Sequence, residues 1–128
     1  MNWESAIDYV GDKVIATDPL YGTYIGILEG LNKYIKEYHG IERAKVRVLA
    51  CIEYPSQKAL LQDTIRPRKP FNYCEVENFD LGSVELYTGE VLDYEYSVQT
   101  SLEKAIKKAT GKELQILQSY RKGVEVRA

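Results

Sequence analysis

The side chains that could carry covalent chemistry in this sequence are two cysteines and one histidine. A nucleophilic cysteine needs a base, so Cys51 or Cys74 would have to meet His39 in the fold. Cys51 shares a face of an alternating segment with charged residues, whereas Cys74 shares a face with Val76. This pattern favours the core for Cys74 and makes Cys51 the better candidate nucleophile. His39, beside a glycine and among charges, is more typical of a solvated loop.

Metal, phosphate and acid–base sites have little support in the sequence. One histidine and two distant cysteines do not give the ligand spacing of a zinc site, and the sequence has no glycine-rich phosphate-binding motif. Glu75 and Glu77 lie two apart on a predicted strand, where paired carboxylates could exchange protons. A solvated strand face explains the same pattern. We therefore predict a non-catalytic protein without metal or cofactor, and keep an enzyme built on Cys51 as an alternative.

Binding chemistry has better support, because basic residues alternate with aromatic ones. This combination can hold single-stranded nucleic acid by charge and by stacking. The candidate binding residues are Lys45, Arg47, Arg66, Arg68, Lys69, Phe71 and Tyr73. A protein partner could use the same residues, or the acidic stretch 75–95. Tyrosines are common anchors in protein interfaces, and this stretch and its end hold Tyr87, Tyr94 and Tyr96.

The charges are segregated along the chain. The net charge is −2 at pH 7, which argues against a general nucleic-acid binder. Residues 1–30 carry a net charge of −4, 31–69 of +5, 70–103 of −8 and 104–128 of +5. Residues 70–103 contain no Lys or Arg. Separate positive and negative surfaces are expected, and they could support self-association.

The elements that must position these residues fit one domain over residues 1–128, with a barrel over about 11–88 and a helical extension over about 97–128. Its composition, 45% hydrophobic and 28% charged, is that of a globular protein. The clearest strand is "RAKVRVLACIEY", in which apolar and mixed positions alternate with period two. The predicted strands are 12–17, 23–30, 43–54, 70–77 and 83–87.

The turns are indicated by proline, glycine and aspartate. "DPLYG" predicts a tight turn after residue 17, and Gly26 predicts a bulge or a close backbone approach. "DLG" predicts a second tight turn at 80–82. Residues 55–70 predict a long excursion, with one helical turn around "QKALLQ".

Helix signals occur at both ends of the chain. Asn2 can cap a short N-terminal helix, and 97–111 predicts an amphipathic helix capped by Thr100 or Ser97. Two segments stay open: 30–42 fits a helix or a strand with loop, and 112–128 fits a helix or a hairpin.

The segment "GDKVIATDPLYGTYIGILE" resembles the KOW motif of SH3-like barrel proteins, which include ribosomal proteins and transcription elongation factors. The resemblance covers residues 11–29. The matching residues are Gly11, Asp12, Val14, Pro19, Tyr21, Gly22 and Gly26. It implies a small, partly open SH3-like β-barrel, here with a C-terminal amphipathic helix, in a mainly β protein with α (α+β). It also implies RNA binding as an alternative function.

The sequence therefore predicts a small binding or adaptor module that acts through protein–protein contacts or self-association. A KOW-like RNA-binding protein is the second hypothesis, and an enzyme using Cys51 is the third. The first ten residues do not resemble a signal peptide, and no apolar run approaches the length of a membrane span. We expect a cytoplasmic protein without a membrane partner.

Overall fold

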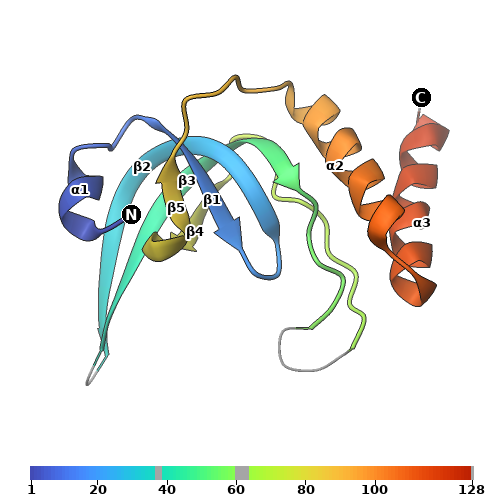
Figure 1. Cartoon of the computed structure of the whole chain (residues 1–128), viewed down its shortest axis with the longest axis horizontal. Coiled ribbons are helices and arrows are strands. Elements are labelled where there is room, and N and C mark those ends of the chain that lie inside the picture. Colours follow the sequence, from blue (N-terminus) through green and yellow to red (C-terminus); the bar gives the residue numbers. More distant parts are fainter. Residues whose placement is uncertain (37–38, 60–63, 128) are drawn as a thin grey trace.

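The protein forms a curved antiparallel sheet of five strands with helices at both ends (Figure 1). The computed structural model describes residues 1–36, 39–59 and 64–127. The strand order is β4-β3-β2-β1-β5. The elements are α1 (Trp3–Ile7), β1 (Lys13–Asp18), β2 (Gly22–Lys36), β3 (His39–Glu53), β4 (Val76–Asp80), the 3-10 turn η1 (Leu81–Ser83), β5 (Val84–Leu86), α2 (Tyr94–Lys108) and α3 (Gly111–Arg127).

The centre of the sheet is the long hairpin of β2 and β3. Its register pairs Thr23 with Glu53 near one end and Leu31 with Ala44 further along. Three register shifts interrupt the pairing, and such bulges increase the bend and twist of a strand. One shift lies at Gly26, where a Cβ atom would collide with the carbonyl of Arg47. Both expectations for Gly26, a bulge and a close approach, are therefore confirmed.

The core lies on the inner face of the curved sheet. Alternate residues of β3 from Ala44 to Ala50 are fully buried, as their period-two pattern predicts. Tyr24, Leu28 and Phe79 are the largest side chains of the cluster they join. Asn2 caps the short helix α1, as predicted, because its side chain accepts a hydrogen bond from the backbone N–H of Ser5 at 2.9 Å.

β4 begins six residues later than the predicted strand 70–77. The reason is a turn at 72–75, in which the Glu75 N–H donates to the Asn72 carbonyl at 3.1 Å. Cys74 in this turn has φ +64°, a left-handed conformation that an extended strand does not contain. The predicted "DLG" turn is the 3-10 turn η1, which Asp80 caps through the N–H of Gly82.

The C-terminal helices differ from the prediction in their boundaries. α2 begins at Tyr94 rather than at 97, because Asp93 accepts the N–H of Tyr96 at 3.1 Å and takes the capping role expected of Ser97 or Thr100. Residues 111–127 form a helix, not a hairpin. Residues 30–36 and 39–42 are strand rather than helix. No helix in the described ranges has both the length and the apolar character needed to cross a bilayer.

Candidate functional site

Phe71 is the centre of an aromatic cluster and not a free stacking platform. Its ring stacks on Tyr21 at a centroid distance of 5.0 Å and contacts Tyr24 and Phe79 at 5.1 and 6.0 Å. Its N–H donates to the Tyr24 hydroxyl at 3.2 Å, and its carbonyl accepts from the Tyr94 hydroxyl. Phe71 therefore fastens the end of the 55–70 segment to the sheet.

A buried glutamine holds the 55–70 segment in place through hydrogen bonds. Gln57 is fully buried, and its amide donates to the carbonyls of Pro55 and Arg68 at 2.9 and 3.1 Å. Its side-chain oxygen accepts the Arg68 N–H at 2.9 Å. Lys58 pairs with Ile65 in an antiparallel bridge, and residues 57–59 are not helical. The remainder of the helical turn expected at 57–62 lies outside the described residues.

Two of the three candidate basic side chains of this segment already make contacts within the protein. The Arg68 guanidinium donates to the carbonyls of Ser56 and Lys58 at 2.8 and 2.7 Å and lies over the Tyr21 ring at 6.0 Å. Lys69 lies over the ring of Tyr120 in α3 at 5.8 Å. Arg66 is exposed.

The remaining candidates lie on or beside β3. Lys45 is exposed, and Arg47, two residues further on the same face, forms an ion pair with Glu29 of β2. Tyr73 is 59% exposed, and its ring contacts Tyr94 at 5.8 Å. The predicted binding residues are thus spread over several parts of the fold. They lie on β3 or in and beside the 55–70 segment, and some of them contact α3 or the start of α2.

The two cysteines have the opposite environments to those predicted. Cys51 is 2% exposed, because α2 covers the end of β3, and Cys74 is exposed in its turn. The backbone N–H of Cys51 donates to the Ser97 hydroxyl at 2.9 Å, and the Ser101 hydroxyl donates to its sulfur at 3.5 Å. Burial raises the pKa of the Cys51 thiol to about 11. The thiol is therefore protonated at neutral pH, unlike an activated nucleophile. The side chain of His39 lies outside the described residues.

Glu75 and Glu77 form an interacting acid pair near the turn before β4. A hydrogen bond to Glu75 raises the pKa of Glu77 to about 7, and partial burial and the charges of Glu75 and Asp18 act in the same direction. Within the described residues, His, Cys, Asp and Glu side chains form no group of three or more that could hold a metal ion.

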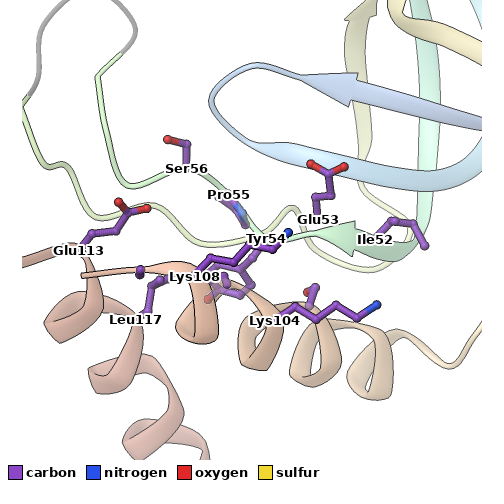
Figure 2. Close-up of a pocket in the computed structure, with 12 residues that line it drawn as sticks. Ile52, Glu53, Tyr54, Pro55, Ser56, Lys104, Lys108, Glu113 and Leu117 are labelled. Atoms are coloured by element: carbon purple, nitrogen blue, oxygen red, sulfur yellow. The ribbon is translucent and has the colours of Figure 1, made fainter. Parts of the chain in front are cut away.

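A cavity of about 520 Å³ lies between the end of β3 and the two C-terminal helices (Figure 2). Lys104 and Lys108 extend from α2, Glu53 from the end of β3 and Glu113 from the start of α3 (Figure 2). Two lysines and two glutamates balance in charge. This cavity therefore offers no net attraction for a charged ligand.

A second cavity of about 520 Å³ is a more apolar groove beside the start of α2. It is lined by Leu49, Tyr73, Val91, Leu92, Asp93, Tyr94 and Glu95. We call these residues the linker groove, because five of them, 91–95, belong to the connection between β5 and α2 or to the first turn of that helix. Leu92 is 40% exposed and Val91 is 37% exposed.

The linker groove contains only one of the predicted binding residues, Tyr73, together with the predicted anchor Tyr94. The sequence does contain a signal for it: "EVLDYEY" places two adjacent aliphatic residues in an acidic connection that has no alternating or helical apolar pattern. Exposed apolar residues that are contiguous in space mark interaction sites more often than single ones.

Comparison with known proteins places the fold but not a family. No family model and no curated protein sequence matches this chain. A crystal structure of kinase-associated protein B from Bacillus cereus is similar, with a TM-score of 0.67 and 23% sequence identity. The similarity covers 91% of this chain and 96% of that one. It supports a small β-rich fold for the whole chain.

Proposed function

We propose that this protein is a non-catalytic binding module that holds a protein partner in the linker groove. The observation that carries this proposal is the exposure of Tyr73, Val91 and Leu92 around one apolar cavity. Tyrosine is enriched among interface anchors, and concave binding sites are lined mainly by hydrophobic and aromatic side chains. The name of kinase-associated protein B says that the Bacillus protein associates with another protein, and we propose an association of the same general kind here.

We also infer that the curved sheet is an SH3-like barrel that remains open. β1 and β4 are not neighbours in the strand order, yet they contact each other. Such a contact supports a sheet that curls toward closure. The KOW resemblance of residues 11–29 gives independent sequence support for the same architecture.

RNA binding is the alternative proposal, and it has less support than the linker groove. It depends on the KOW resemblance and on exposed basic residues such as Arg66 and Lys69. Arg68 donates to two carbonyls of its own segment, and Arg47 is paired with Glu29. These two guanidiniums are therefore less available to phosphate groups.

The test of the protein-binding proposal is site-specific photo-crosslinking in the cells that make the protein. A benzophenone side chain at position 73 should give a discrete adduct with a second protein. The adduct should be lost when Leu92→Glu places a charge in the groove, because the apolar contact is then disrupted. The matched control is the same probe at Ile7, which is 55% exposed on α1. Adducts at position 73 that survive Leu92→Glu, or no adduct at all, would contradict the proposal.

A further inference from the structure

The linker groove has a chemistry that selects one class of partner segment. We infer that it binds an extended stretch of a partner protein in which one or two apolar residues are flanked by Lys or Arg. This inference rests on the proposed function, since it specifies what the same groove takes. Three features of the described residues carry it: the charge of the groove, its backbone and its size.

The charge of the groove is uniformly acidic. Asp93 and Glu95 line it directly, and the segment from 70 to 103 that supplies most of its lining contains eight acidic residues and no basic one. Burial, followed by the nearby Cys51 thiol, raises the pKa of the Tyr94 hydroxyl to about 12, and the charges of Glu95 and Glu75 make smaller contributions in the same direction. A cationic segment would therefore be attracted, and an acidic one repelled.

Basic side chains of the neighbouring strand do not cancel this charge. Leu49 is the only lining residue contributed by β3, and Arg47 lies two residues before it. Arg47 forms an ion pair with Glu29 on the adjacent strand β2. Its positive charge is therefore already compensated, and the carboxylates at the start of α2 face a partner without a nearby intramolecular cation in the groove lining.

The backbone beside the groove favours an extended partner. Residues 88–92 connect β5 to α2 outside any helix or strand (Figure 1). None of them is proline, and none of their N–H groups donates a hydrogen bond to another described residue. These N–H groups can donate to the main chain of an extended peptide, whereas the carbonyls of Gly89 and Glu90 already accept from the Lys13 ammonium and the Tyr87 hydroxyl. Main-chain pairing of this kind gives affinity, and alternate side chains give specificity.

The size of the groove limits the apolar part of the partner. A volume of about 520 Å³ is within the range of pockets that enclose compact ligands. It accommodates a few side chains and not the whole face of a long helix. The apolar contact is therefore short, and the flanking charges must supply the remaining selectivity.

The experiment is a selection from a displayed library of random nonapeptides on the intact chain, with counter-selection on Leu92→Lys, which removes the apolar contact and repels a cationic segment. We expect the enriched peptides to contain at least two Lys or Arg residues around an apolar centre. A synthetic peptide of the consensus should bind at least tenfold more weakly to the double variant Asp93→Asn, Glu95→Gln, which keeps a side-chain oxygen at the helix cap. Two N-methylated forms of this peptide should also be compared, each with methyl groups on one of the two sets of alternate residues. Binding should weaken for one set and not for the other.

The outcomes separate this inference from the proposed function. Enriched peptides with neutral or acidic flanks, or a consensus that tolerates N-methylation in both registers, would overturn the inference while leaving the groove as a protein-binding site. A consensus that matches residues 104–112 of this chain would indicate that the groove binds a second copy of the chain. It would overturn the inference of a separate partner protein. Absence of any enrichment over Leu92→Lys would overturn the proposed function and the inference together.

Discussion

At the residue scale, the pair of Glu75 and Glu77 links the stability of the protein to pH. The hydrogen bond to Glu75 and the nearby carboxylates favour the protonated form of Glu77 in the folded state, with a pKa of about 7. In the unfolded chain a glutamate titrates near 4.3. The folded state thus holds this proton more tightly, and the stability from it falls as the pH rises from about 4.3 to about 7.

Glu77→Gln should therefore stabilise the protein above pH 7 and have little effect at pH 4. The amide can keep a hydrogen bond to Glu75 at every pH without bringing a second negative charge. Because the site is partly exposed to solvent, we expect a gain of about 1 kcal/mol or less, which is a rise in melting temperature of about 3 °C. Thermal unfolding at pH 4, 6 and 8 measures it.

The matched control for this prediction is Glu85→Gln, which removes the same formal charge from an exposed position of β5. A stabilisation by Glu77→Gln of equal size at all three pH values would contradict the proton-sharing account. Equal behaviour of the two variants would assign the effect to net charge alone.

Single residues could be predicted where their environment is local. The alternating burial of Ala44 to Ala50 follows from strand geometry and was predictable. The two cysteines were not, because their exposure is decided by other parts of the chain. Cys51 is buried by a helix that begins more than forty positions later, and the left-handed turn at Cys74 breaks the alternation on which its predicted burial depended.

At the element scale, the 55–70 segment keeps its shape through one side chain. Gln57→Ala would leave the partly buried N–H and carbonyl of Arg68 without their Gln57 partner, at a cost of about 1 to 2 kcal/mol. We expect a lower midpoint in chemical denaturation and faster tryptic cleavage after Lys58 or Arg68. Gln99→Ala, at an exposed position of α2, is the control and should change stability by no more than about 0.5 kcal/mol. Unchanged proteolysis in Gln57→Ala would contradict this account.

The packing of α2 also explains why sequence patterns could predict some elements and not others. β3 pairs with β4 over Arg43–Arg47, and the backbone of Val48 bonds to Glu75 and Cys74 in the turn before β4, so the end of that edge beyond Val48 needs another partner. α2 supplies it, with Ser97 and Ser101 buried against Cys51. The apolar residues at 30–42 fit both a helical and a strand period. Pairing between β2 and the strongly alternating strand β3 favours the extended form. Pairing of this kind is a tertiary property that a local pattern does not contain.

At the scale of the whole molecule, the segregated charges should make association sensitive to salt. Acidic groups gather at the linker groove, whereas the C-terminal segment from 104 is basic. We expect weak self-association in about 50 mM salt that disappears in about 500 mM salt, because exposed charges are screened beyond a few ångströms at high ionic strength. Sedimentation velocity at several protein concentrations measures it. A monomer at both salt concentrations would contradict the self-association expected from the segregated charges.

The candidate site itself was the least predictable feature. The predicted binding residues follow from composition along the chain, whereas the linker groove brings together Leu49, Tyr73 and residues 91–95. These segments are separated by an excursion, a turn and two strands, so their meeting depends on the packing of α2 onto β3. Only the exposed aliphatic pair in "EVLDYEY" is visible beforehand.

Asp93 has two structural roles, and together they restrict which substitutions at this position the protein can accept during evolution. Its carboxylate lines the groove, and it also accepts the N–H of Tyr96 at the first turn of α2. Loss of a helix cap costs about 1 kcal/mol. A lineage that shifts toward a less basic partner would therefore lose stability by replacing Asp93, whereas Glu95 is not a capping residue. We expect recognition to drift first through Glu95, with position 93 confined to the small set of residues that can start a helix.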